Sequence, residues 1–207
     1  MVFCFALVGV CALILILYGL FELHYFLRIC LSVILARFKT KIHVLDEATV
    51  RGICVTSDID TLLFHMNNAR YMRELDFARV DFYERTGLYR CIKSKGGGLV
   101  MGATTIRYRR FVKLFHKYIL TSKVTYWDDQ NIYMEHRFIS PGDRFINAIV
   151  MTKTRLINCN AEEIMQEMIL SKNDPEYRGK TRPEIPPDLE KWMESNTISS
   201  QALRGVV

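Results

Sequence analysis

Charged side chains are almost absent from the first 27 residues of this 207-residue chain, where Glu22 is the only side chain with a formal charge at pH 7. The run VFCFALVGVCALILILYGLF within that segment is about 20 residues long. At 1.5 Å per helical residue, such a run matches a hydrocarbon core of roughly 30 Å. We therefore expect residues 1–27 to form an N-terminal hydrophobic anchor that spans a membrane.

A cleaved secretory signal is the alternative interpretation of the same run. No basic residue follows Met1, so the positively charged start of a signal peptide is lacking. The following sequence, LYGLFELHYF, is bulky and offers no cleavage site between small residues. We therefore favour a retained anchor, with a protein secreted after signal cleavage as the alternative.

Cysteine pairs at metal-binding or redox spacing are also lacking. The chain has six cysteines but no CxxC motif, and it has no Asn-x-Ser/Thr acceptor for N-glycosylation. Both absences favour a reducing, cytosolic environment over a disulfide-stabilised secreted protein. We expect neither a metal site nor a cofactor.

The basic residues nearest the hydrophobic run all follow it: Arg28, Arg37, Lys39 and Lys41. By the positive-inside rule, the folded part of the chain then faces the cytosol. We read residues 28–46 as a juxtamembrane amphipathic segment that lies along the bilayer surface, and the formal net charge of +6 suits an anionic leaflet. Because no basic patch is interleaved with base-stacking aromatic residues on one element, we expect no nucleic-acid partner.

The next part of the chain predicts a strand and a long helix. Residues 48–56 are rich in β-branched and apolar side chains and read as a strand. NNARYMRELDFARVDFYERTG then reads as a helix over 68–86, with Asn67 or Asn68 as its N-cap and Gly87 at its C-terminal end.

Beyond residue 96 the apolar period changes to two. Four long strands are predicted, at 97–112, 117–129, 131–140 and 143–158, with DDQN and SPGD as turns. Strands joined by hairpins are antiparallel, and a sheet with one apolar face needs an element packed against it. We therefore predict an α+β fold over residues 47–172, with an antiparallel sheet wrapped around one central helix. Residues 173–207 read as a C-terminal extension with an amphipathic helix.

The sequence SDIDTLLFHMNNAR gathers polar side chains just where the central helix begins. They are Asp58, Asp60, His65, Asn67 and Asn68. The free backbone N–H groups and the dipole of a helix N-terminus can hold the oxygen of a thioester carbonyl as it gains negative charge. A carboxylate just upstream can act as nucleophile or activate water. The structural alternative is that the amides cap the helix and the other groups make loop hydrogen bonds.

The stretch DIDTLLFHMNNARYMRELDFAR resembles the signature of hotdog-fold thioesterases, commonly D-x-D-x-x-x-H-x-N-N-x-x-Y. Within that superfamily the chain is similar to the membrane-anchored thioesterase superfamily member 6 proteins. The similarity extends to the anchor, to WDDQNIYMEHRF and to the tail PPDLEKWMESNTISSQ. The resemblance implies a hotdog fold, a homodimer, acyl-CoA or other acyl thioesters as substrates, and the endoplasmic reticulum membrane as location.

By position, the resemblance implies a catalytic set and a substrate-binding set. The catalytic set is Asp60 as the acid together with His65 and Asn67, and the substrate-binding set is Asn68, Tyr71 and Phe64. This chain departs from the common motif in two ways. Four residues instead of three separate the acid from the histidine, and the bulky Phe64 stands where a small residue is usual, at the entrance for the acyl chain.

Two hypotheses follow from these residues. The leading one is a membrane-anchored acyl-CoA thioesterase-like protein that hydrolyses or handles fatty acyl thioesters in lipid metabolism. The alternative is a non-catalytic acyl-lipid-binding or scaffolding protein with the same fold, which the two departures from the motif favour.

Two further features have competing interpretations. RYRRFVK, residues 107–113, has the charge to meet the phosphates of coenzyme A, but we favour a solvated strand face or a membrane-facing patch. Glu74 has the position of a second catalytic acid, but its spacing from Arg70 favours a surface ion pair along the helix.

Overall fold

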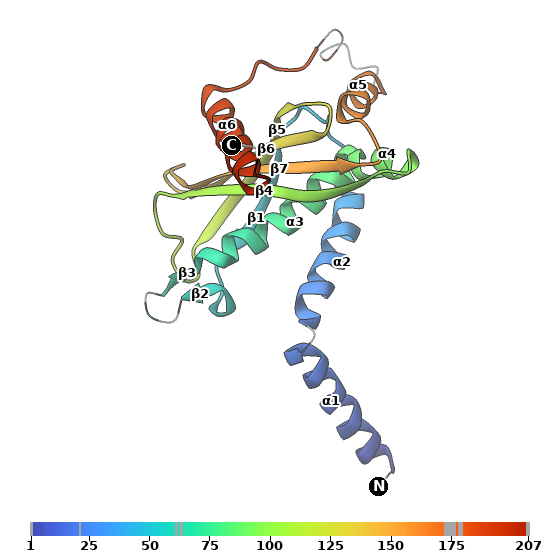
Figure 1. Ribbon diagram of the computed structural model, residues 1–207. Coiled ribbons are helices and arrows are strands. Elements are labelled where there is room, and N and C mark those ends of the chain that lie inside the picture. The colour runs from blue at the N-terminus through green and yellow to red at the C-terminus, as the bar shows by residue number, and fades with distance from the viewer. Residues whose placement is uncertain are drawn as a thin grey trace.

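Five strands form a single antiparallel sheet in the computed structural model, which describes residues 2–20, 22–60, 62, 64–171, 177 and 180–205. Their order across the sheet is β1-β5-β6-β7-β4. The strands are β1 (Ala48–Ile53), β4 (Gly98–Tyr108), β5 (Lys117–Trp127), β6 (Asn131–Ile139) and β7 (Ile146–Ile157). The sheet curls around helix α3 (Asn68–Thr86), as Figure 1 shows. The predicted α+β architecture is confirmed.

Helix α3 buries one apolar face, whose residues recur at helical spacing. Tyr71, Leu75, Ala78 and Phe82 are all buried against the sheet. The caps are also confirmed, because the Asn67 side chain accepts a hydrogen bond from the helix backbone and Gly87 adopts the left-handed φ of 85° that a glycine tolerates without strain.

The strand predictions were correct in existence and pairing but too long at their ends. The predicted strand 143–158 begins only at Ile146, because Asp143 lies in a turn and its carboxylate accepts the Phe145 N–H. A short helix, α4 (Leu88–Ser94), lies between α3 and β4 in the sequence. It was not predicted. Its seven residues are too few to display a helical period.

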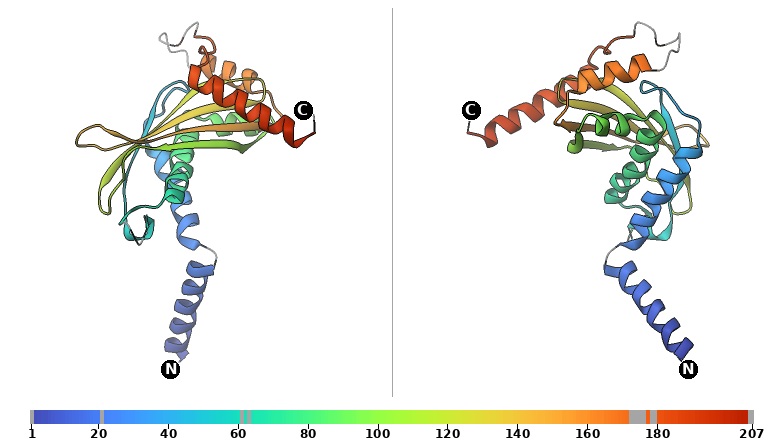
Figure 2. Two further views of the ribbon diagram at one scale, coloured as in Figure 1. Left: turned by 60° about the vertical axis from the view of Figure 1, so that its left-hand side comes forward. Right: turned by 90° about the vertical axis from the view of Figure 1, so that its right-hand side faces the viewer.

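Two helices precede the sheet. Within α1 (Val2–Leu20), the stretch Phe3–Leu20 is long and apolar enough to cross a membrane by length and composition, and none of it is buried in the protein. It projects away from the domain in every view of Figures 1 and 2. Helix α2 (Leu23–Phe38) instead packs along α3. The segment predicted to lie on the bilayer therefore has one face against the folded domain.

Ion pairs attach α2 to α3. Arg28 pairs with Glu74, Arg37 with Glu84 and Lys39 with Asp81. Glu74 is only 5 % exposed, so the predicted surface pair between Glu74 and Arg70 is wrong. The i,i+4 rule favoured Arg70 because the sequence alone does not show that a second helix covers this face of α3.

The C-terminal part adds two helices at the end of the domain opposite α1, as Figures 1 and 2 show. They are α5 (Ala161–Ser171) and α6 (Pro187–Leu203), and α6 confirms the helix predicted in the C-terminal extension. Leu189 of α6 is buried beside Tyr126 and Tyr133 of the sheet. The predicted boundary between residues 172 and 173 lies outside the described residues.

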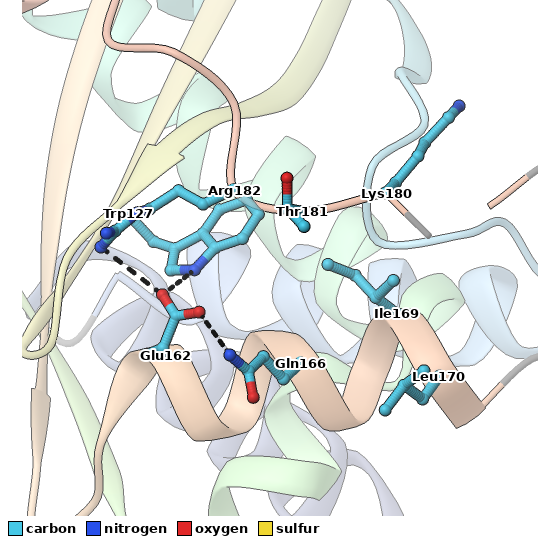
Figure 3. A pocket seen from close by; sticks show the side chains of 8 residues that line it. All are labelled: Trp127, Glu162, Gln166, Ile169, Leu170, Lys180, Thr181 and Arg182. Carbon is cyan, nitrogen blue, oxygen red and sulfur yellow. Dashed lines mark hydrogen bonds and ion pairs between the residues drawn. The ribbon is translucent and has the colours of Figure 1, made fainter. Parts of the chain in front are cut away.

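Glu162 ties α5, the sheet and residues 180–182 together. Its carboxylate accepts hydrogen bonds from Trp127 Nε1 at 2.8 Å and from Gln166 Nε2 at 2.7 Å, and it lies 3.5 Å from an Arg182 guanidinium nitrogen (Figure 3). These residues line one side of an open groove of about 480 Å³. In Figure 1, α5 lies at the end of the domain opposite the β2–β3 hairpin that precedes α3.

We expect Glu162→Ala to lower the free energy of unfolding by about 2 kcal/mol, because the fully buried Trp127 would lose the partner of its N–H group. Chemical denaturation in detergent micelles measures the change. The matched control is Glu163→Ala, an exposed neighbour on the same helix, which should change stability by less than about 0.5 kcal/mol. Equal effects of the two variants would contradict this account of Glu162.

A small polar layer lies inside the sheet's concave face. His136 of β6 is fully buried between Met134 and Phe138 on the same face of the strand. Its Nδ1 lies 2.7 Å from Ser122 Oγ and its Nε2 lies 3.3 Å from Thr152 Oγ1. Burial, with a contribution from the charge of Arg79, lowers the pKa of His136 to about 3.

This pKa predicts an acid-sensitive fold. The unfolded chain takes up a proton at this histidine below about pH 6.5, whereas the folded chain stays neutral until about pH 3. The free energy of unfolding should therefore fall by up to about 1.4 kcal/mol per pH unit between those limits. Denaturation at a series of pH values should show a smaller loss in His136→Gln than in the native chain, while His116→Gln, at an exposed position, should not differ.

Candidate active site

A small hairpin presents the candidate acid and histidine side by side. Strands β2 (Ile59–Asp60) and β3 (His65–Met66) pair antiparallel, with Asp60 directly opposite His65. Directly opposed residues project to the same face, with Cβ atoms about 5 Å apart. The carboxylate and the imidazole are therefore neighbours, which the spacing of the motif alone did not predict.

The extra residue of the motif is absorbed by the turn between these two strands. The Leu62 N–H donates to Asp60 Oδ1 at 2.9 Å, and the Phe64 N–H donates to the Asp60 carbonyl at 3.0 Å. Phe64 adopts a left-handed conformation with φ of 50°, which is strained for a bulky residue. Asp60 and His65 thus remain paired despite the longer spacing, and the Phe64 side chain is exposed.

Asp58 holds the hairpin against the start of α3. It is buried, and its Oδ2 accepts the Val55 N–H at 3.0 Å. Its carbonyl accepts the Asn67 N–H at 2.8 Å, immediately before the helix. Each aspartate of the motif thus accepts one backbone N–H with one carboxylate oxygen, and the two differ in burial, because Asp58 is buried and Asp60 is partly exposed.

His65 is buried but not fully satisfied. Its ring stacks on Phe111, with ring centroids 4.1 Å apart and planes 5° apart. Nδ1 lies 3.0 Å from the Met66 carbonyl, and a carbonyl only accepts, so Nδ1 carries the proton. In the neutral ring Nε2 is then an acceptor, and among the described residues this atom has no hydrogen-bond partner although it is buried.

The N-terminus of α3 offers one free backbone donor. The Asn67 side chain accepts the Ala69 N–H at 2.9 Å, and the Asn67 carbonyl accepts the Arg70 N–H at 2.9 Å. No bond between described residues uses the Asn68 N–H. Asn68 itself is exposed, and its carbonyl accepts the Tyr108 hydroxyl. Asn67 therefore acts as a helix cap in this structure, and the Asn68 N–H has no acceptor among the described residues.

Tyr71 lies in the core instead of on the surface of the site. Its ring packs edge-on against Tyr108 and Phe138, and its oxygen accepts the Val112 N–H at 3.4 Å. Burial raises the pKa of Tyr71 to about 12. Its visible role is to join α3 to the segment that follows β4.

Two other candidates for chemistry are unsuited to it in this arrangement. Glu74 is engaged by the Arg28 guanidinium and by the Tyr118 hydroxyl, which donates to it at 2.6 Å. Burial and the nearby charges of Asp58 and Glu74 raise the pKa of Cys54 to about 11, so its thiol stays protonated and a poor nucleophile.

The segment after β4 completes the surroundings of the hairpin. The Met66 N–H donates to the Val112 carbonyl at 2.8 Å, and the Leu114 N–H donates to the Phe64 carbonyl at 3.2 Å. Sequence reasoning missed Phe111 as a contact of His65, because nothing in the sequence pairs two segments so far apart. Within the described ranges, no cluster of side chains has the composition of a metal site.

Comparisons with known proteins agree with this architecture. Residues 54–193 match the family model described as the thioesterase-like superfamily. The chain is 43 % identical over 192 residues to Protein THEM6 of Drosophila melanogaster, covering 92 % of this chain and 95 % of that protein. It is 37 % identical over 191 residues to Protein THEM6 of Danio rerio, covering 92 % of this chain and 91 % of that protein.

Solved structures show the same fold at low sequence identity. A probable thioesterase from Escherichia coli, YbaW, superposes with a TM-score of 0.55 at 19 % identity, covering 58 % of this chain and 95 % of that one. A 1,4-dihydroxy-2-naphthoyl-CoA thioesterase from Synechocystis gives 0.53 at 10 % identity, covering 63 % of this chain and 100 % of that one. The sheet around α3 is therefore a hotdog fold. The chain belongs to the thioesterase-like superfamily and, within it, to the thioesterase superfamily member 6 family.

Proposed function

We propose that this protein is a membrane-anchored acyl-CoA thioesterase that hydrolyses fatty acyl thioesters in lipid metabolism. The observation that carries the proposal is the cross-strand pair of Asp60 and His65 beside the N-terminus of α3. Among the described residues, one carboxylate oxygen of Asp60 and the Nε2 atom of His65 have no hydrogen-bond partner. Both are therefore acceptors for the hydrogens of a water molecule, and because Nε2 is buried the side chains that cover it must move for that water to bind.

The proposed reaction begins with that water. It donates one hydrogen bond to the Asp60 carboxylate and the other to His65 Nε2, and its oxygen attacks the carbonyl carbon of the thioester. As the C–O bond forms, the water proton passes to Asp60 and the carbonyl oxygen becomes negative. Asp60 is the general base and His65 orients the water.

The Asn68 N–H and the dipole of α3 stabilise the negative oxygen. When the tetrahedral intermediate collapses, the carbon–sulfur bond breaks and the thiolate of coenzyme A leaves. The proton held by Asp60 neutralises the departing sulfur. The products are a fatty acid and coenzyme A, and no cofactor is needed for this sequence of steps.

The location follows from α1 and from the chemistry of the substrate. Long acyl chains partition into membranes, and α1 has the length and composition of a membrane span. We expect the folded domain to face the cytosol at the endoplasmic reticulum, as the family resemblance implies. Resistance of the protein to alkaline extraction from membranes tests the anchor, and protease protection in intact vesicles tests the orientation.

The domain should also form a homodimer through β4. This strand pairs with β7 on one side, and its other side pairs with no strand in the described part of the chain. Unpaired sheet edges favour pairing with another chain. We expect Met101→Lys, which places a charge on this exposed edge, to weaken dimerisation at least about tenfold, as measured by analytical ultracentrifugation in detergent. A native chain that is monomeric at all concentrations would contradict the dimer.

The second candidate function is acyl-lipid binding without catalysis. The longer turn and the strained Phe64 favour it, because this turn sets the position of Asp60. A displacement near 1 Å at a catalytic group can cost about a hundredfold in rate.

The experiment that separates the two functions is hydrolysis of acyl-CoAs of graded chain length by the full chain in detergent or vesicles. Turnover that depends on chain length supports the thioesterase. Saturable acyl-CoA binding without release of free thiol would replace it with the binding protein. If the chain neither hydrolyses nor binds acyl-CoA, both functions are refuted.

A further inference from the structure

Large apolar side chains are exposed on the loops around the candidate active site. Leu62, Phe64, Phe111 and Phe115 are between 62 % and 85 % exposed. We call these four residues the loop patch. Apolar side chains this exposed and this close together mark a surface that interacts with a partner or a membrane.

Backbone hydrogen bonds hold the loop patch together. The Leu114 N–H donates to the Phe64 carbonyl at 3.2 Å, and the Phe115 N–H donates to the Cys54 carbonyl at 2.8 Å. Phe64 and Phe115 both adopt left-handed conformations, with φ of 50° and 60°. Bulky residues rarely adopt this conformation without a surrounding structure that enforces it, so the outward aromatic side chains are built into the fold.

The surroundings of the loop patch are basic. A groove of about 650 Å³ beside it is lined by Arg110, Lys113, His116 and Lys117 and by a single acidic residue, Asp143. Arg110 engages that acid with two bonds of 2.7 and 2.9 Å. Lys113 and Lys117 are exposed and remain as net positive charge next to the aromatic side chains. Apolar residues ringed by lysine and arginine suit the interface of an anionic bilayer.

The loop patch also lies at the end of the domain that a membrane docking surface requires. In Figures 1 and 2 the β2–β3 hairpin is at the end of the domain from which α1 projects, and α5 and α6 lie at the opposite end. A bilayer crossed by α1 would therefore run close to the hairpin.

We propose that the loop patch docks into the headgroup region of the same anionic bilayer that α1 spans. The aromatic side chains then insert to a depth of roughly 5–10 Å, and Lys113 and Lys117 contact lipid phosphates. Docking places the Asp60–His65 hairpin at the membrane surface, where an acyl thioester can enter from the bilayer without crossing water. This inference rests on the proposed anchoring by α1, and the experiment tests the two separately.

Depth-dependent fluorescence quenching tests the docking. The full chain is reconstituted in phosphatidylcholine vesicles with and without phosphatidylserine, and lipids brominated near the headgroup or deep in the acyl chain serve as quenchers. Tryptophan is introduced by Phe64→Trp or Phe115→Trp in the loop patch. Leu13→Trp reports on the middle of α1, and Ile198→Trp is the matched control at an exposed position of α6. The signal of Trp127 and Trp192 is measured in the native chain and subtracted.

The expected result is at least about twofold stronger quenching at positions 64 and 115 than at position 198, with the shallow quencher most effective. Lys113→Glu should reduce this quenching in phosphatidylserine vesicles, whereas Lys191→Glu on α6 should not. Quenching at position 13 without quenching at 64 or 115 would overturn the docking and leave the anchor intact, and it would indicate that the patch faces water or a second copy of the chain. Loss of quenching at all four positions would overturn both.

Discussion

Asp60→Asn should reduce the rate of acyl-CoA hydrolysis by about 10²- to 10⁴-fold, the usual contribution of a general base. The substitution is isosteric, and the asparagine oxygen can still accept the Leu62 N–H that Asp60 Oδ1 accepts. The turn and its pairing with His65 should therefore survive, while the negative charge that removes a proton from water is lost. The measurement is the initial rate of thiol release at saturating acyl-CoA.

The matched control is Asp129→Asn, the same chemical change at an exposed turn away from the hairpin, which should keep the native rate. Binding of acyl-CoA should change little in Asp60→Asn, so the loss should appear in kcat and not in KM. A variant that retains native turnover would refute Asp60 as the base. A variant that loses binding and turnover together would point to a role for Asp60 in shaping the site.

His65→Gln separates orientation from base catalysis. The glutamine oxygen can still accept a hydrogen bond, but the amide has no ring held by a bond from Nδ1 to the Met66 carbonyl, so it orients the water less precisely, while Asp60 remains as base. We expect a smaller loss than in Asp60→Asn, about tenfold or more, in the same assay. A loss equal to that of Asp60→Asn would indicate that the two residues act as a unit.

The central helix and the sheet could be predicted because their signals are local. The apolar period of α3, its cap at Asn67 and the Gly87 terminus are all contained in one continuous segment. The motif predicted that Asp60 and His65 lie near the start of α3, but their directly opposed positions come only from the pairing of β2 with β3.

The contacts that the sequence did not reveal join segments far apart in the chain. Phe111 stacks on His65 because the loop after β4 returns beside β3, which no local pattern encodes. The exposure of Phe64 likewise follows from a backbone conformation that the sequence does not predict. Such long-range contacts shape the surface around the candidate site, and the motif alone did not predict that surface.

The Arg28–Glu74 pair is the long-range contact with the largest expected effect on stability. Two guanidinium nitrogens of Arg28 bind both carboxylate oxygens of Glu74, at 2.5 and 2.6 Å, and the guanidinium lies 3.9 Å from the centre of the Phe77 ring. Burial and the Glu74 charge raise the pKa of Tyr118, which stays protonated and donates to the same carboxylate. The helix that follows α1 thus supplies the cation for a buried acid in the middle of α3.

Arg28→Ala should lower the free energy of unfolding by about 3 kcal/mol, because the Glu74 carboxylate would stay buried with the Tyr118 hydroxyl as its remaining described donor. This is the lower end of the range for a broken buried pair, since the Arg28 side chain is 36 % exposed. Chemical denaturation in detergent gives the change, and hydrogen exchange should show α2 released before the sheet. Arg37→Ala, whose pair with Glu84 is largely exposed on the arginine side, should cost less than about 1 kcal/mol.

A double variant that replaces both charged residues by neutral ones separates the effect of charge on stability from the effect of packing. In the double variant Arg28→Met with Glu74→Gln, both charges are gone, and the Tyr118 hydroxyl can still donate to the amide oxygen. Replacing both members of a buried ion pair often costs little, so this variant should recover most of the stability that Arg28→Ala loses. If the double variant is as unstable as Arg28→Ala, packing of the Arg28 side chain on Phe77 would be what holds α2 in place, and the charge on Glu74 would be secondary.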